Sequence, residues 1–415
     1  MVPRMTRREW LASGVFSASL FWSGGRSVWG AQGSAIKLPG PDRSHQAPAA
    51  PVAIRRCATY DPQPLRHALD EALDLIGGID KLVRGKTVTI KLNLTGGPTG
   101  TIGGLPPHRT YHVHPNLVAA LCAALVDAGA RHLVLVEGQY SRKTPEEVLS
   151  AAGWDVAGIN AAGEHRVRWV DTRNRGKAPA YSRLKVPWGG LIYPAFDVNP
   201  AYEKTDVYIS LAKLKDHAAA GVTMACKNNF GMPPTALYGG DAPNENTTHY
   251  RGDVLHLGKK KVPAGVPAEL DHGVAVGDWA RRVPRVTADV VGARPIDLAV
   301  IDAIETNRGG EGPWIKGVEP IRPNLILAGL NPVCTDAVCM AVMGYDPQAD
   351  HFHFPPFHGE NHLRLLASLG VGTIDLERIE VRGLSIKEAL CPFNPKRLPV
   401  PLAGPRLGCH YGRVA

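Results

Sequence analysis

Three basic side chains alternate with other residues immediately after an apolar stretch of the chain. Lys213, Lys215 and His217 follow the segment 206–211, which reads Asp-Val-Tyr-Ile-Ser-Leu. Side chains two positions apart in an extended segment point to the same side, so the three groups can face one ligand. Cationic groups at a strand end suit an anion such as a carboxylate or a phosphate. The alternative is a solvated basic edge that protects a strand from further pairing.

A lysine stands alone among small and apolar residues in the segment that follows. Residues 218–232 read Ala-Ala-Ala-Gly-Val-Thr-Met-Ala-Cys-Lys-Asn-Asn-Phe-Gly-Met, and we expect a helix that contains Lys227. Burial in such surroundings disfavours the ammonium form and lowers the pKa of the amine unless an anion meets it. Lysines of this kind act as nucleophiles or hold cofactors. In the alternative, Lys227 extends to the surface, and Asn228 and Asn229 end the helix before Gly231.

Polar residues also follow another apolar stretch. Lys91 and Asn93 come at the end of the segment 87–92, before a glycine-rich loop. Because ligands of open α/β sheets bind beyond the carboxyl ends of the strands, we expect these groups to meet the basic ones described above. In this hypothesis His217 is the acid or base, and Lys227 holds a cofactor or activates the substrate. The groups that bind the small anionic ligand or cofactor are then Lys91, Asn93, Lys213, Lys215 and Asn228.

The segments that would position these groups alternate between strand-like and helix-like patterns. Strands are expected at 52–57, 87–92, 132–137, 167–170, 206–211, 296–304, 323–329 and 379–382, and helices at 64–76, 115–128, 333–343 and 362–369. Another helix should start at Thr144, with Pro145 at its first position and Glu147 completing a capping box. Continuous apolar strands separated by helices predict an α/β fold with a mostly parallel, doubly wound sheet. The chain forms either one composite unit or two lobes with a cleft.

Composition agrees with many short elements joined by turns. The chain has 415 residues, of which 44% are hydrophobic and 20% charged, with 45 glycines and 35 prolines. These proportions exclude a coiled coil, an all-helical bundle and a wholly disordered chain. The net charge of +9 is modest for this length, so nucleic acid is not an expected partner. The chain also lacks the phosphate-binding and dinucleotide-binding glycine motifs, so ATP and NAD are not indicated.

The first residues resemble an export signal. Thr6-Arg7-Arg8-Glu9 is a twin-arginine pattern, and a short apolar stretch and small residues near Ala31 follow it. We expect a signal peptide at 1–31, a linker at 32–51, the α/β domain at 52–389 and a Pro-rich arm at 390–415. The protein would then be exported folded by the twin-arginine machinery to the periplasm or another extracytoplasmic space. No stable membrane span is expected in the mature protein, because no apolar run approaches the ~20 residues that a span requires. The alternative is a chance pair of arginines near the N-terminus.

The spacing of the cysteines and histidines indicates which of them can bind a metal. The seven cysteines contain no C-x-x-C pair, so no cysteine-ligated iron–sulfur cluster is expected. Cys391 and Cys409 can pair in an oxidising compartment. Small core residues are expected at the other five positions, 57, 122, 226, 334 and 339. His351 and His353 alternate in a histidine-rich stretch and can chelate a metal, although a packed surface loop is the alternative.

Several of these segments together resemble the bacterial family known as domain of unknown function 362. They are Lys91-Leu-Asn93, His114-Pro115, Asp127-Ala-Gly-Ala130, Lys213-Leu-Lys-Asp-His217, Lys227-Asn-Asn-Phe-Gly231 and Asn331-Pro-Val-Cys-Thr-Asp336. The resemblance covers residues from about 86 to about 350. Some members carry a pair of ferredoxin-like cysteine motifs, which this chain lacks.

A second resemblance is to lactate racemases that use a nickel-pincer nucleotide. His217, Ala220-Gly221 and Lys227 reproduce the spacing between a strand-end histidine and the lysine to which the cofactor is tethered. This resemblance implies a related fold and pocket, with a tethered nickel nucleotide or divalent metal at Lys227 and His249 as a metal ligand. The chain departs from the pattern at Tyr140, near the place of a second catalytic histidine, and in the spacing of His249.

Three hypotheses follow for the function. The first is an exported isomerase-like or oxidoreductase-like enzyme that acts on a small anionic substrate. The second is a non-catalytic periplasmic protein that binds an anion in the same cleft. The third is an assembly factor for a redox or metal enzyme. We expect Lys91, Lys213, His217 and Lys227 to converge on one pocket, and the site hypothesis fails without that convergence.

Overall fold

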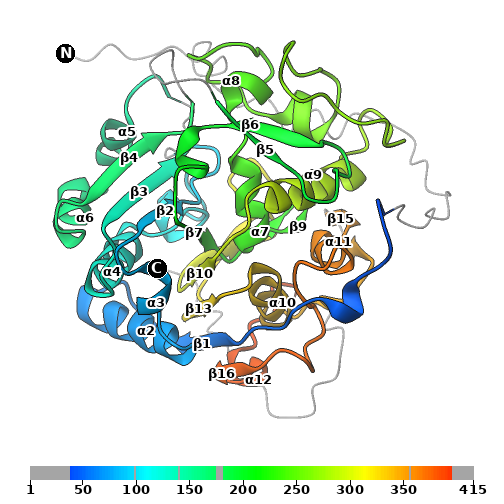
Figure 1. Cartoon of the computed structure of the whole chain (residues 1–415). Coiled ribbons are helices and arrows are strands. Elements are labelled where there is room, and N and C mark those ends of the chain that lie inside the picture. The colour runs from blue at the N-terminus through cyan, green and yellow to red at the C-terminus, as the bar shows by residue number, and fades with distance from the viewer. Residues whose placement is uncertain (1–37, 98–99, 139–140, 174–180, 355–356, 395–415) are drawn as a thin grey trace.

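Eight apolar segments pair into one central sheet (Figure 1). The computed structural model describes residues 38–97, 100–138, 141–173, 181–354 and 357–394. The strand order in the sheet is β16-β1-β13-β10-β7-β2-β3-β4. The strands are β1 (Val52–Arg56), β2 (Thr87–Lys91), β3 (His132–Glu137), β4 (Val167–Asp171), β7 (Val207–Lys213), β10 (Leu298–Ala303), β13 (Leu325–Gly329) and β16 (Val381–Gly383).

All strands of this sheet except β13 run in the same direction. The pairs β4–β3, β3–β2, β2–β7, β7–β10 and β1–β16 are parallel, whereas β13 is antiparallel to both β10 and β1. The expected α/β fold with a mostly parallel sheet is confirmed. The reversal follows from the connection between β10 and β13, because antiparallel neighbours need no crossover helix. That connection instead holds the two-stranded sheet of β11 (Thr306–Arg308) and β12 (Glu319–Ile321).

Helices cover both faces of the sheet (Figure 1). One hydrophobic core joins the sheet to α2 (Pro62–Leu75), α4 (Pro115–Asp127) and α6 (Val156–Ala162). A second core joins the opposite face to α7 (Met224–Asn228), α9 (Trp279–Ala293), α10 (Pro332–Val342) and α11 (His362–Ser368). The smaller helices are α3 (Asp80–Val83), α5 (Pro145–Ala151), α8 (Thr235–Tyr238) and α12 (Ile386–Ala389). The smaller strands form the pairs β5 (Ser182–Lys185) with β6 (Ala195–Val198), β8 (Asp216–His217) with β9 (Gly221–Val222), and β14 (His351–Phe354) with β15 (Phe357–Glu360).

Local signals explain where several helices begin. Thr144 accepts a hydrogen bond from the Glu147 amide, and the Glu147 side chain accepts one from the Thr144 amide, which is the expected capping box of α5. At α4, Pro115 occupies the first turn, and the His114 ring accepts a hydrogen bond from the Asn116 amide. The five cysteines predicted as small core residues are buried and free, as expected.

The predicted helix over 218–232 is wrong in its first half. Gly221, at φ +75°, lies in the hairpin of β8 and β9, and Met224 has φ +40°. Backbone with positive φ does not continue an α-helix. The regular α-helix is therefore α7 alone, and it places Lys227 one residue before its end.

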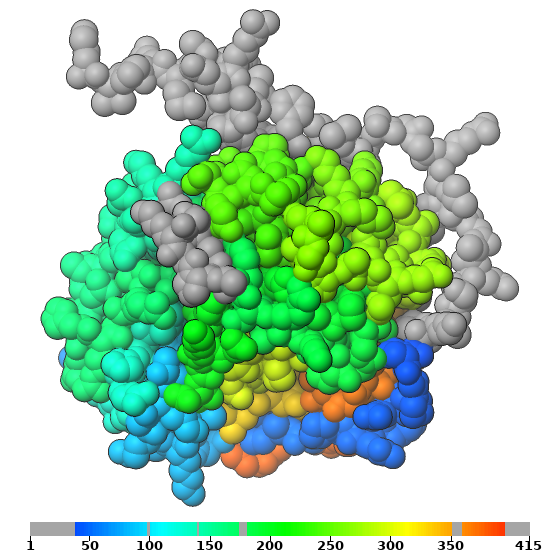
Figure 2. Space-filling view, turned by 45° about the horizontal axis from the view of Figure 1, so that its top comes forward, coloured from blue at the N-terminus to red at the C-terminus, as the bar shows by residue number. Residues whose placement is uncertain are grey.

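The strands nearest to the two ends of the described chain lie side by side. β1 pairs with β16, and Figure 2 shows the first and last described segments together along one edge of the molecule. None of the helices in the described ranges is long and apolar enough to cross a bilayer. The expected signal peptide at 1–31, Cys409, Tyr140, most of the Pro-rich arm and the side chains of His351 and His353 lie outside what the structure describes.

Candidate functional site

Lys213, at the end of β7, is buried in an ion pair with Asp302 of the neighbouring strand β10. Its Nζ lies 2.9 Å from Asp302 Oδ2, and both side chains are fully buried. Lys213 also donates a hydrogen bond of 3.1 Å to the hydroxyl of Tyr60, which in turn donates one of 2.7 Å to Asp302 Oδ1. Burial lowers the pKa of Lys213, and the charge of Asp302 opposes that change. The lysine predicted to bind an anion therefore already has a carboxylate partner.

Lys91, at the end of β2, is paired in the same way with Glu137 at the end of β3. Its Nζ lies 2.6 Å from Glu137 Oε1 and donates another hydrogen bond to the Leu92 carbonyl. Glu137 also accepts hydrogen bonds from the amides of Leu94 and Gly138. This ion pair ties two strand ends and the loop after β2 together, and the charge of Lys91 is neutralised there.

The two predicted asparagines hold backbone in place. Asn93 donates a hydrogen bond of 3.2 Å to Asn228, and its own oxygen accepts one from the Lys213 amide. Asn228 donates to the Ser210 hydroxyl and the Lys91 carbonyl. The pair thus connects α7 to the carboxyl ends of β2 and β7, which is a positioning role.

Lys215 and Lys227 have no such carboxylate partner. Lys215 Nζ donates one hydrogen bond, of 2.6 Å, to the Tyr111 carbonyl. Lys227 Nζ lies 3.9 Å from the centre of the Phe230 ring, and within the described ranges it has neither a hydrogen bond nor an ion pair. Both residues are buried, and burial lowers the pKa of each to about 7. Each is then partly uncharged at neutral pH.

We call the groups around these lysines the basic cluster: Lys215, His217, Lys227, His256, His362 and Glu311. The positive charge of Lys227 lowers the pKa of all three histidines. The His256 ring lies 4.8 Å from the Phe230 ring, which Lys227 Nζ also contacts. Burial is the larger cause in each case, and it lowers the pKa of His256 and of His362 to about 3. The negative charge of Glu311 raises the pKa of both Lys215 and Lys227, but burial lowers it further than Glu311 raises it. The cluster therefore holds two lysines, three neutral imidazoles and one carboxylate.

Several polar atoms of the basic cluster make no well-formed hydrogen bond within the described residues. Both ring nitrogens of His362 and Nδ1 of His256 are buried without a hydrogen bond of good geometry. His217 differs, because its Nδ1 accepts a hydrogen bond of 3.1 Å from the Ala219 amide. The proton of the neutral His217 ring is then on Nε2. Unpartnered buried polar atoms are uncommon in proteins and indicate a ligand, an ion or water.

A carboxylate from another helix orients α7 and, with it, Lys227. Both oxygens of Asp336 in α10 accept hydrogen bonds from α7 amides, of 2.9 Å from Ala225 and 2.7 Å from Cys226. These amides belong to the first turn of the helix, where N–H groups have no partner within it. The Thr223 amide donates to the Lys215 carbonyl, so the hairpin and the helix start are joined directly.

His249 lies apart from the basic cluster. It is exposed and neighbours Gly240 and Asp241. In the part of the chain that is described, no group of three or more His, Cys, Asp and Glu residues could hold a metal ion. His249 as a metal ligand stays a prediction, and no chemical step is derived through such a group.

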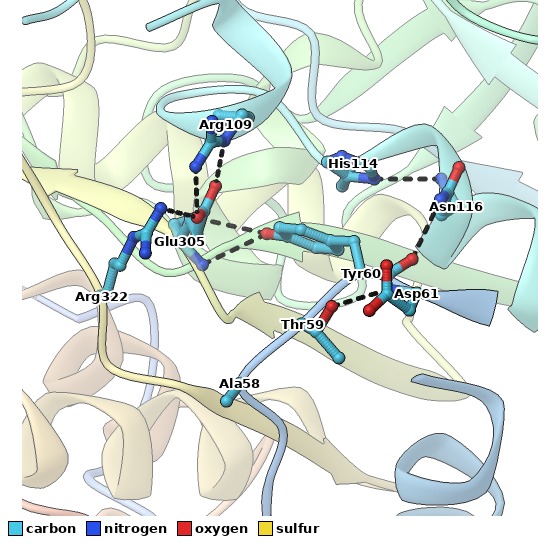
Figure 3. Close-up of a pocket in the computed structure, with 9 residues that line it drawn as sticks. All are labelled: Ala58, Thr59, Tyr60, Asp61, Arg109, His114, Asn116, Glu305 and Arg322. Carbon is cyan, nitrogen blue, oxygen red and sulfur yellow. Dashed lines mark hydrogen bonds and ion pairs between the residues drawn. The ribbon is translucent and has the colours of Figure 1, made fainter. Parts of the chain in front are cut away.

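A separate pocket opens near the carboxyl end of β1 and has a volume of about 420 Å³ (Figure 3). None of the predicted site residues lines it. It is lined by Ala58, Thr59, Tyr60, Asp61, Arg109, His114, Asn116, Glu305 and Arg322. Tyr60 connects this pocket to the buried pair of Lys213 and Asp302, through its hydroxyl group.

Sequence reasoning missed some members of both sites. Glu311 lies in the polar segment that follows the apolar residues 296–304, and His362 is the last histidine of the stretch that begins at His351. Both positions stand out in the sequence, but neither was predicted to lie near Lys227. His256 ends a π-helical turn (Gly252–His256), and no strand of the described chain precedes it nearby in the sequence. Tyr60 and Arg322 are single residues in connecting segments, and no spacing pattern marks them.

Comparison with known proteins gives one match. No curated protein and no solved structure matches this chain. The sequence model described as "Domain of unknown function (DUF362)" matches residues 88–341, which include β7 and α7 entirely and most of β2 and α10. That match spans more than half of the sequence, and the chain therefore belongs to the DUF362 family.

Proposed function

We propose that the basic cluster binds a small anionic molecule, a short carboxylic acid or a phosphate-bearing compound, and that Lys227 acts on it. One observation carries this proposal: Lys227 is a buried residue, and its Nζ makes no hydrogen bond and no ion pair with the described part of the chain. A buried ammonium group is costly unless an anion or a set of acceptors meets it. A bound anion would supply the ionic partner that Lys227 does not find within the described part of the protein.

The surrounding groups add the properties that such a ligand requires. Lys215 brings a second cation, and the unpartnered nitrogens of His256 and His362 can donate or accept hydrogen bonds. His217, with its proton on Nε2, has one donor left for a ligand. Two lysines against Glu311 leave the cluster with a positive balance when both are charged.

A pKa near 7 also lets Lys227 exchange a proton at neutral pH. The uncharged amine can accept a proton from a bound acid, and the ammonium form can return it. This favours an enzyme with acid–base chemistry over a passive binding protein. The non-catalytic alternative predicts that binding occurs without any turnover.

The proposal is tested by ligand-induced stabilisation at pH 6.5, with acetate, L-lactate and inorganic phosphate as probes. At about 100 times its Kd, a bound probe should raise the free energy of unfolding by about 2.7 kcal/mol. Binding should weaken above pH 7, because the charged form of Lys227 is then lost.

Two lysine variants provide the comparison. Lys227→Met should abolish the stabilisation by anions. Lys204→Met removes an exposed lysine just before β7, at the opposite end of the same strand, and should leave it intact. Equal stabilisation of both variants and the wild type would refute an anion site at Lys227. Binding that survives His217→Ala with no turnover in the wild type would indicate the non-catalytic alternative.

We also propose that the protein is exported folded by the twin-arginine route. The support is the Arg7-Arg8 pair followed by apolar and small residues. Replacing both arginines with lysine should leave the full-length chain in the cytoplasmic fraction of a bacterial host. Recovery of that variant in the periplasm in wild-type amounts would contradict this route.

A further inference from the structure

The pocket near the carboxyl end of β1 is separate from the basic cluster. None of the cluster residues is among those that line its volume of about 420 Å³. That volume lies in the range of small-molecule sites. Figure 3 shows Arg109, Arg322 and Glu305 at one end, Asp61 and Asn116 at the other, and Tyr60 between them.

One end of the pocket has more cations than anions. Arg109 donates two hydrogen bonds, of 2.6 and 2.7 Å, to the two oxygens of Glu305. Arg322 lies 2.7 Å from the same carboxylate. Two guanidinium groups therefore share one carboxylate, and N–H groups of both remain available to a ligand. The Arg322 side chain is 44% exposed and the Arg109 side chain 33%, so both can be reached from the pocket.

The other end has an unpaired anion. Asp61 is the N-cap residue of α2, but its side chain makes no capping hydrogen bond. Within the described residues its carboxylate has no other partner either, although it lines the pocket. The Asp61 amide and the Thr59 hydroxyl are hydrogen-bonded at 3.0 Å, which fixes the backbone there. The carboxylate is thus an acceptor for a cationic group.

The middle of the pocket is rigid and aromatic. The Tyr60 and His114 rings are stacked, with centroids 3.7 Å apart and planes 9° from parallel. The Tyr60 hydroxyl is anchored to Asp302, and Asn116 donates a hydrogen bond of 2.9 Å to the Tyr60 carbonyl. His114 Nδ1 accepts from the Asn116 amide, so its Nε2 carries the proton. The stacked rings of Tyr60 and His114 therefore lie between the two charged ends of the pocket and keep them at a fixed separation.

We propose that this pocket binds a small zwitterion, an amino acid or a compound with the same pair of charges. The carboxylate of the ligand pairs with the free N–H groups of Arg109 and Arg322, which form planar donor sets that match a carboxylate. The ammonium group pairs with Asp61. A ligand with only one of the two charges leaves one end of the pocket unmatched, so the pocket discriminates against it.

Calorimetric titration of the full chain tests this proposal, with L-alanine and L-leucine as zwitterions and propionate and propylamine as singly charged controls. In the Lys227→Met variant, whose basic cluster should no longer bind anions, we expect an amino acid to bind at least about tenfold more tightly than propionate, which corresponds to one charge-assisted contact. Arg322→Met should weaken amino-acid binding about tenfold. Arg84→Met, which removes an exposed arginine paired with Asp80 on α3, should leave it unchanged.

The Asp61→Asn variant tests whether the pocket recognises both charges of a zwitterion or only the negative charge of an anion. Asparagine is as good an N-cap residue as aspartate, so the helix start is preserved. This variant should bind the amino acids as weakly as propionate, while its affinity for propionate equals that of the wild type. Lys227→Met should retain amino-acid binding, because that lysine belongs to the other site. The proposal is overturned if propionate matches the amino acids in the Lys227→Met variant, or if neither amino acid binds that variant in the millimolar range.

Discussion

Replacing Asp302 with alanine should lower the free energy of unfolding by about 4 kcal/mol, the largest loss that we expect from a single substitution at the carboxyl edge of the sheet. The substitution leaves the Lys213 ammonium group buried without its carboxylate. It also removes the acceptor of the Tyr60 hydroxyl and of the His114 amide. Denaturant unfolding followed by circular dichroism measures the change, and the slope with denaturant should stay constant.

A double variant checks the cause of this loss. Lys213→Met with Asp302→Leu replaces the ion pair with apolar side chains and should restore most of the lost stability, because no buried charge remains unpaired. If the double variant is as unstable as Asp302→Ala, lost packing or lost hydrogen bonds explain the effect, and the charge of Lys213 does not.

Replacing Lys227 with methionine should have the opposite effect and raise the free energy of unfolding by about 2 kcal/mol below pH 7. A pKa that falls from 10.5 to about 7 corresponds to at most about 5 kcal/mol of unfavourable burial for the charged form. Methionine keeps the unbranched shape and removes the charge. Residues that lower the stability of the folded protein are expected at functional sites, because function there is kept at a cost in stability.

The pH dependence identifies the charge as the origin of this gain. The folded-state pKa of Lys227 is lowered, so the unfolded chain binds its proton more tightly between pH 7 and 10.5. The penalty is therefore absent above pH 10.5, grows as the pH falls to 7, and is complete below 7. The advantage of Lys227→Met should follow that curve, whereas Lys204→Met should show no such trend. A methionine variant that is less stable than the wild type at pH 6 would contradict the assigned state of this lysine.

The central layer of the fold was predictable because its strands are continuously apolar. A parallel strand buried on both faces has a sequence pattern that needs no tertiary information, and β3 occupies the residues expected for it. The direction of β13 was not predictable, because the apolar sequence of a buried strand does not depend on whether the strand is parallel or antiparallel to its neighbours. The hairpin before α7 was missed because Ala-rich sequence favours helix, and no local sequence pattern marks the positive φ of Met224.

The candidate site was predictable only as a region. Strand-end positions identified Lys91, Lys213 and Lys215, but sequence did not show which lysine has a buried carboxylate beside it. Glu137 and Asp302 come from neighbouring strands, so their pairing depends on strand order. His256 and His362 reach Lys227 from segments that carry no strand-end signal, and only the tertiary structure brings them together.

The connection between β10 and β13 supplies residues to both sites. Glu305 and Arg322 form the cationic end of the pocket, and Glu311 belongs to the basic cluster. Both ends of this connection are anchored in adjacent antiparallel strands, so no helix packed on the sheet depends on its length. It is therefore the natural segment to exchange in protein engineering: grafting this loop between family members should alter the proposed ligand preferences of two sites at once, provided that Ile304 and Ile321, which pack in the hydrophobic cores, are kept.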